Sequence, residues 1–236
     1  MKSVFLTAEW RNLVMVNYNV TPSVLKKYLP TRTELDQWNS TNLVSLVGFQ
    51  FFNTRIKGIR IPYYVNFEEV NLRFYVRRKM ENEWRRGVVF ISEIVPKPAI
   101  ALVANLLYDE KYTATKMRSM IYGRTGLNAK YEWKSGKNWN KIYFHATSEP
   151  KPIIEGSLEE FITEHYWGYN RVNENKTTEY QVEHPRWRVF PVEDYSVECD
   201  FKSNYGNAFS FLNQAKPHSV FMAEGSEIKV RGGLRI

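Results

Sequence analysis

The clearest structural signal in this chain is FEEVNLRFYVRRKMENEWRRGVVFISEIV, residues 67–95. Residues 67–77 and 86–95 are rich in β-branched and aromatic residues, which favour strands. The charged and polar residues 81–83 lie between them. Because two such runs on either side of a short polar segment are typical of a β-hairpin, we predict two antiparallel strands here.

Extended segments continue on both sides of this hairpin. Residues 43–52, LVSLVGFQFF, predict a strand that is buried on much of both faces. Residues 12–18, NLVMVNY, predict another strand. Further short strands are expected over residues 111–122, 129–133, 139–146, 169–172, 178–182, 187–191, 218–222 and 227–231.

Three short helices are expected among the strands. One begins at Pro22, a favoured first helical residue, and ends before Pro30. A second follows Pro98, because the apolar residues at 100, 103, 104 and 107 fall on one helix face. A third begins after Ser157, where Ser-x-x-Glu matches a capping box.

The expected fold is therefore α+β and mainly antiparallel β, with a few short helices in a single domain over residues 1–236. A sheet of about a dozen strands must protect its edges, and closure into a barrel or cone does so. Such barrels tend to enclose a ligand cavity. We therefore expect a closed or cone-shaped barrel with an interior pocket.

The chain is basic: 33 Lys and Arg stand against 25 Asp and Glu in 236 residues, a formal net charge of +8. A basic chain is a candidate for nucleic-acid binding. However, its densest basic groups, residues 77–79 and 85–86, flank the hairpin turn and predict a solvated tip. The apolar runs are shorter than the roughly 18 residues of a membrane-spanning helix. We therefore expect no membrane partner and do not favour nucleic acid.

Cys199 is the only cysteine, so the chain forms no intrachain disulfide. The first residues contain no apolar core of a signal peptide. Together these features predict a reducing, cytoplasmic location. Glu198 and Asp200 flank the thiol, and their charges would raise its pKa, so a nucleophilic cysteine is not expected.

Glu69, Asn71 and Arg73 are the candidate site residues that the pattern of one strand indicates. In a strand they share one face, while Val70 and Leu72 take the other. Pointing inward, their charges must pair with each other or meet a ligand, because a buried lone charge is costly. Two alternatives are that these three side chains face solvent, or that Glu69 and Arg73 form an ion pair within the barrel wall. We favour the inward orientation.

Other signatures of chemistry are weak. The four histidines, His145, His165, His184 and His218, have no metal-ligand spacing and predict no metal site. Neither a glycine-rich phosphate loop nor a Gly-x-Ser-x-Gly elbow is present, so no cofactor is predicted.

Six stretches resemble one known family. They are residues 5–13 (FLTAEWRNL), 43–49 (LVSLVGF), 66–73 (NFEEVNLR), 86–90 (RGVVF), 159–167 (EEFITEHYW) and 184–187 (HPRW). Together they resemble the YqjF-like family of uncharacterised bacterial proteins, over nearly the whole chain. That family is related in fold to acetoacetate decarboxylase, whose β-barrel or cone encloses a pocket for a small acidic substrate. The resemblance implies the same architecture here.

The resemblance implies different chemistry, however. Acetoacetate decarboxylase forms a Schiff base through a lysine that a second lysine activates. Here the paired lysines fall on Tyr112 and Thr113, and a supporting arginine falls near Asn19. A supporting glutamate falls on Glu69. Lys111 and the lysine five residues later would lie on opposite strand faces, so they do not replace the pair.

By the same resemblance, four further residues line the pocket: Tyr108, Arg118, Tyr166 and Trp167. They are aromatic or can donate hydrogen bonds to a ligand.

Three functions remain open. The first is binding of a small organic molecule, such as a carboxylate, without Schiff-base chemistry. The second is an enzyme in which Glu69 is the acid or base and Arg73 holds an anion. The third is a scaffold or interaction protein, including a nucleic-acid binder. Ligand turnover that Glu69→Gln abolishes would distinguish the second, and salt-dependent nucleic-acid binding the third. An exposed sheet edge could also support a homodimer.

Overall fold

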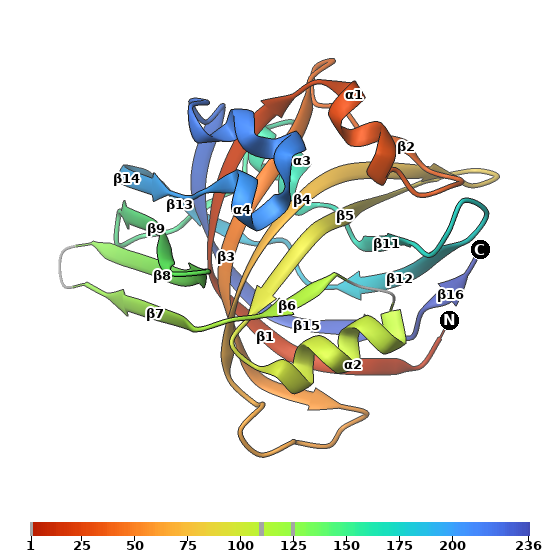
Figure 1. Ribbon diagram of the computed structural model, residues 1–236, viewed down its shortest axis with the longest axis horizontal. Coiled ribbons are helices and arrows are strands. Elements are labelled where there is room, and N and C mark those ends of the chain that lie inside the picture. Colours follow the sequence, from red (N-terminus) through yellow and green to blue (C-terminus); the bar gives the residue numbers. More distant parts are fainter. Residues whose placement is uncertain (1, 109–110, 124–125) are drawn as a thin grey trace.

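A computed structural model of the chain describes residues 2–108, 111–123 and 126–236. It contains a twelve-stranded sheet, a four-stranded sheet and short helices (Figure 1). Most strand pairs are antiparallel; the parallel ones join β5 to β6 and β11. The fold is therefore mainly antiparallel β with a few helices, as the sequence predicts.

The predicted hairpin is confirmed. Strands β4 (Phe67–Lys79) and β5 (Trp84–Val95) pair antiparallel, and residues 80–83 form the turn. Strand β3 (Asn42–Ile56) pairs with the other side of β4. Its first eight residues are all buried, as expected for a strand covered on both faces.

The two faces of these strands carry separate apolar cores. Val70, Leu72 and Phe74 of β4 belong to one core, together with aromatic residues of the four-stranded sheet. The other core contains Val47 of β3 and Tyr75 of β4. By alternation, Glu69, Asn71 and Arg73 share the face of Tyr75. The row of polar residues thus lies on a covered face.

The path of hydrogen-bonded strands returns to its start. It runs from β15 (Ser219–Arg231) through β1 (Val4–Val20), β3, β4 and β5. A two-residue parallel pairing then joins β5 to β11 (Trp167–Arg171), with Gly87 opposite Trp167. Strand β12 (Thr177–Glu183) pairs with β11 and, at Val182 and Glu183, with β15. The two ends of this run of strands are therefore joined through β12.

The four-stranded sheet covers the other face. Its order is β14 (Val192–Glu198), β9 (Asn138–Ala146), β8 (Leu127–Ser135) and β7 (Met117–Tyr122). This sheet lies at the left in Figure 1. Tyr131, Trp133, Ile142 and Phe144 are fully buried between the sheets. This packing shields the back of the wall that carries the polar row.

The three expected helices are present. They are α1 (Pro22–Leu25), which continues into the 3-10 helix η1 (Lys26–Tyr28), α2 (Pro98–Tyr108) and α3 (Leu158–Thr163). The Ser157 side chain caps α3 by accepting from the backbone N–H of Glu160. The return bond of the expected capping box goes instead to Gly156, whose N–H donates to the Glu160 carboxylate.

Helix α4 (Phe201–Tyr205) and the 3-10 helix η2 (Asn207–Asn213) were not predicted. The Asp200 side chain caps α4 by accepting from Ser203, a signal visible in the sequence. Five short strands complete the fold: β2 (Glu34–Leu35), β6 (Tyr112–Ala114), β10 (Lys151–Pro152), β13 (Arg188–Phe190) and β16 (Leu234–Arg235).

Two strand predictions differ from the structure. Residues 111–122 form two strands in different sheets, β6 and β7, rather than one. Conversely, the strands expected over residues 218–222 and 227–231 are parts of the single strand β15, which begins at Ser219. Gly225 interrupts the sequence pattern of this strand. Its φ is +80°, and a Cβ there would collide with the carbonyl oxygen of Trp10, so the position requires glycine.

Within the described part of the chain, no helix has the length and apolar character needed to cross a membrane.

Candidate functional site

A cavity of about 230 Å³ lies against one face of the large sheet. Side chains from all seven strands of the closed path line it, together with α2 and the loop between β3 and β4. Ile59 and Ile61 of that loop line the cavity and are also exposed, so the loop borders its opening. Most of the wall is apolar, and its aromatic residues include Trp10, Phe49, Phe51, Phe67, Phe90 and Trp187.

One wall of the cavity is polar. Glu69, Asn71 and Arg73 of β4 line it, with exposed fractions of 1%, 1% and 8%. The Asn71 side-chain N–H donates to Oε1 of Glu69 at 2.8 Å, and the Tyr112 hydroxyl donates to Oε2 at 2.8 Å. The row therefore faces the cavity and not solvent, and Glu69 is held by two donors.

Strand register explains why this wall is polar. Asn71 lies opposite Glu93 of β5, and Glu93 lies opposite Tyr112 of β6. Facing residues of neighbouring strands share a face, so these three side chains project from the same side. Sequence reasoning did not assign Glu93 or Tyr112 to the pocket, because alternation along one strand does not identify the residues opposite. A register shift between Leu72 and Arg73 further obscures that pairing.

Arg73 is the unusual residue of the wall. Its guanidinium lies 6.0 Å from the ring centre of Tyr75, and its Nε has no hydrogen-bond partner. Among the described residues, no carboxylate lies within ion-pair distance of it. A buried guanidinium without a counter-ion is energetically costly, by roughly several kcal/mol. The position is thus suited to an anion that enters the cavity.

His165, which follows α3, forms a second polar group of the cavity. Its Nε2 lies 3.1 Å from Oδ2 of Asp36, and Arg86 donates to the same oxygen at 2.6 Å. Burial lowers the pKa of His165 to about 4, although the bond to Asp36 acts in the opposite direction. Burial also opposes ionisation of Asp36, but the bonds from His165 and Arg86 outweigh it and lower its pKa. At pH 7 the pair is a neutral imidazole and a carboxylate.

His184 also lines the cavity. Its ring stacks on Trp187, with ring centres 4.2 Å apart, and lies 4.7 Å from the ring of Tyr166. Burial lowers the pKa of His184, and its Nδ1 lies 2.9 Å from the carbonyl oxygen of Pro185. This histidine is held as part of the aromatic wall.

The four residues assigned through the family resemblance do not lie together. Trp167 lines the cavity. Tyr166 is a neighbour of the wall, since its ring contacts His184, but its hydroxyl donates to Glu164. Arg118 is on β7 of the other sheet, 60% exposed and bonded to Glu132, so it does not reach the cavity. The side chain of Tyr108 lies outside the described residues.

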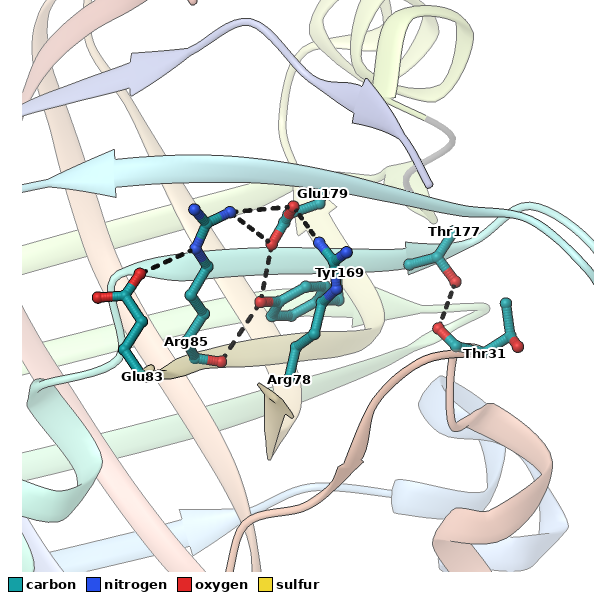
Figure 2. A network of polar contacts seen from close by, with 7 residues as sticks. All are labelled: Thr31, Arg78, Glu83, Arg85, Tyr169, Thr177 and Glu179. Carbon is teal, nitrogen blue, oxygen red and sulfur yellow. Dashed lines mark hydrogen bonds and ion pairs between the residues drawn. The ribbon is translucent and has the colours of Figure 1, made fainter. Parts of the chain in front are cut away.

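A second charged cluster lies apart from the cavity, around Glu179 of β12. Figure 2 shows the guanidinium groups of Arg78 and Arg85 directed at its carboxylate, with the Tyr169 hydroxyl between them. Arg78 donates at 2.7 Å, and the Tyr169 hydroxyl at 3.1 Å. These bonds join β4 and β5 to β11 and β12. The cluster therefore stabilises the short β5–β11 junction. Its charged groups pair with one another, so it is not a candidate binding site.

Metal ligands are not gathered in the described part of the chain, where no three His, Cys, Asp or Glu side chains could hold an ion together. The partly buried cysteine is also unsuited to nucleophilic chemistry, because desolvation and then the charge of Asp200 raise the pKa of Cys199.

The chain is similar in sequence to one family of known proteins. Residues 7–227 match the model of DUF2071, a family described as uncharacterized conserved proteins. The chain is 28% identical over 183 residues to the uncharacterized protein YqjF of Bacillus subtilis strain 168, which covers 75% of this chain and 72% of YqjF. These matches agree with the resemblance drawn from the sequence.

Similar solved structures share the fold. An acetoacetate decarboxylase-like enzyme from Sphingomonas wittichii RW1 matches 99% of this chain and 93% of its own, with a TM-score of 0.67 and 10% identity. Acetoacetate decarboxylase from Legionella pneumophila matches 98% and 87%, with a TM-score of 0.66 and 13% identity. The enduracididine biosynthesis enzyme MppR, complexed with pyruvate, matches 100% and 91%, with a TM-score of 0.68 and 10% identity. The chain therefore has an acetoacetate decarboxylase-like fold.

Proposed function

Starting from the fact that the chain belongs to the DUF2071 family of uncharacterized conserved proteins, we propose that it binds a small organic carboxylate in this cavity. The observation that carries the proposal is Arg73, a buried guanidinium that lines the cavity without an ion pair among the described residues. A bidentate bond to a carboxylate would satisfy it. The aromatic wall would hold the apolar body of the ligand.

The fold neighbours support the same class of ligand. MppR has been solved with pyruvate, a small carboxylate, on the same fold. Pairing of β12 with β15 supports a barrel that encloses the ligand. The single cysteine, Cys199, supports action in a reducing compartment such as the cytoplasm.

Binding without a Schiff base is part of the proposal. Among the described residues that line the cavity, none is a lysine. Lys111 and Lys116 are both exposed. Tyr112, at the position of the paired lysines, instead donates its hydroxyl to Glu69. This arrangement supports noncovalent recognition of the carboxylate.

An enzyme on the same scaffold is the second candidate. Glu69 lines the cavity on the same strand face as Arg73, four residues away, so a molecule held by Arg73 and extending along the strand would meet its carboxylate. Glu69 would then act as acid or base on the bound molecule. Asn71 and Tyr112 fix its orientation through the two hydrogen bonds described above.

Calorimetric titration tests the carboxylate site. Propanoate and 3-phenylpropanoate are each compared with the corresponding amide, which has nearly the same shape but no charge. We expect the acids to bind and the amides to bind at least tenfold more weakly, since a charge-assisted hydrogen bond contributes about 1.5–3 kcal/mol.

Arg73→Met should remove this preference for acids. Arg77→Met is the matched control, because Arg77 lies on the same strand but pairs with Glu34 outside the cavity. Equal binding of acids and amides by the unaltered protein would refute the proposal. Turnover of a bound acid that Glu69→Gln abolishes, with binding retained, would establish the enzymatic alternative.

A further inference from the structure

Two residues that line this cavity, Asn71 and His165, each carry a buried hydrogen-bond acceptor with no partner among the described residues. One is Oδ1 of Asn71, whose side-chain N–H is directed to Glu69. The other is Nδ1 of His165, whose Nε2 is directed to Asp36. Both residues line the cavity and are more than nine-tenths buried. Because buried polar atoms are nearly always paired, these two atoms indicate hydrogen bonds to a ligand.

The neighbours of each atom fix it as an acceptor. Asp36 is a carboxylate, so the proton of the neutral His165 ring resides on Nε2 and the lone pair on Nδ1. A charged imidazolium would donate from Nδ1, but burial keeps the ring neutral at pH 7. The Asn71 amide is oriented in the same way, because only its N–H can donate to the Glu69 carboxylate.

Both acceptors lie near Arg73. Asn71 is two residues away on the same strand face. The rings of His165 and Tyr75 have centres 4.8 Å apart, and the guanidinium of Arg73 lies 6.0 Å from the same Tyr75 ring. The positive charge of Arg73 also acts on the His165 ring. One end of the cavity therefore combines a cation with two hydrogen-bond acceptors.

We propose that the ligand is a carboxylic acid with a hydrogen-bond donor, either a hydroxyl or an ammonium group, on the carbon next to the carboxylate. Arg73 holds the carboxylate, and the donor group bonds to Asn71 Oδ1 and His165 Nδ1. The aromatic wall accommodates the rest of the molecule. This inference rests on the proposed function, and it adds the feature that distinguishes the ligand from a simple acid.

Three acids with one carbon skeleton test the donor. 3-Phenylpropanoate, 3-phenyllactate and phenylalanine carry hydrogen, hydroxyl and ammonium on carbon 2. We expect one of the two substituted acids to bind the unaltered protein at least tenfold more tightly than 3-phenylpropanoate, and its identity distinguishes hydroxyl from ammonium. Propanoate, lactate and alanine are titrated in the same way, so that the size of the ligand does not decide the result.

His165→Leu tests the acceptor itself, because it removes Nδ1 and leaves an apolar side chain. We expect about a tenfold loss of affinity for the preferred acid and no change for the unsubstituted acid. His165→Gln should restore part of the affinity, because its amide can donate to Asp36 and also supplies a carbonyl acceptor. His218→Leu is the control, since His218 is exposed and does not line the cavity.

The outcomes separate the two proposals. If unsubstituted and substituted acids bind equally well, the donor inference is wrong while the carboxylate site stands. If His165→Leu weakens the binding of both acids equally, His165 is structural and its assigned role is overturned. If acids bind no more tightly than amides, the carboxylate site itself is refuted, and this inference with it.

Discussion

Lowering the pH from 7 to 5 is expected to remove about 2 kcal/mol of folding free energy through His165 alone. Burial lowers the pKa of this residue from its ordinary value of 6.5 to about 4. Between these two values the unfolded chain binds a proton that the folded protein does not, so stability falls as the pH falls. Each pH unit in this window contributes about 1.4 kcal/mol, and the loss is complete below pH 4, at about 3 kcal/mol.

The charged groups around the ring determine this behaviour. Asp36 favours the protonated ring, whereas Arg86 and Arg73 oppose it, and burial is the largest effect. The side chain is only 1% exposed, and Tyr75 and Phe161 pack against it. Solvent therefore cannot stabilise the charged ring in the folded state.

Urea unfolding at pH 7 and pH 5 measures the effect. The unaltered protein is compared with His165→Gln, which retains a donor to Asp36 and cannot titrate. We expect the pH-dependent loss of unfolding free energy to be smaller in the variant by about 2 kcal/mol. His184→Gln is a second comparison, because burial lowers the pKa of His184 as well. Nuclear magnetic resonance of the histidine ring carbons should show that His165 stays neutral at pH 5. An imidazolium signal there, or equal pH dependence in protein and variant, would refute the reasoning.

Three further predictions concern stability, each measured by urea unfolding. Arg73→Met should raise the free energy of unfolding of the ligand-free protein by about 1–2 kcal/mol, because it removes a buried lone charge; a loss would show that the guanidinium is paired. Glu179→Gln should lower the free energy of unfolding by about 2 kcal/mol, because Arg78 and Arg85 lose their carboxylate partner. High salt should reduce this difference between variant and unaltered protein. Gly87→Ala should lower the free energy of unfolding by about 1–3 kcal/mol, since a Cβ there would collide with the carbonyl oxygen of Trp167 at the β5–β11 junction.

Local sequence patterns were sufficient for much of the fold. The hairpin of β4 and β5 could be predicted because its apolar runs and polar turn are adjacent in the chain. The family resemblance is carried by short stretches of this kind, and the family match confirms it. By contrast, the division of residues 111–122 between two sheets depends on which distant strands they pair with, and no local pattern reports that.

The candidate site also combines residues that a local pattern predicts with residues that only the pairing of distant strands identifies. Alternation along β4 placed Glu69, Asn71 and Arg73 on one face, and both faces of the strand proved to be covered. Glu93 and Tyr112 joined this wall only through register across β5 and β6. Resemblance alone also selected Arg118, which lies on the other sheet.

The sequence by itself determined the mainly antiparallel fold, the family and the polar row of β4, because these follow from side-chain periodicity and from residues close together in the chain. Only the tertiary structure decided that Arg73 has no ion-pair partner among the described residues and that His165, which lines the cavity, has a buried nitrogen without a partner among them. The environment of His165 comes from Asp36 and Arg86, far away in the sequence. Burial and pairing of a charge depend on all the segments that surround it, and folding alone brings those segments together.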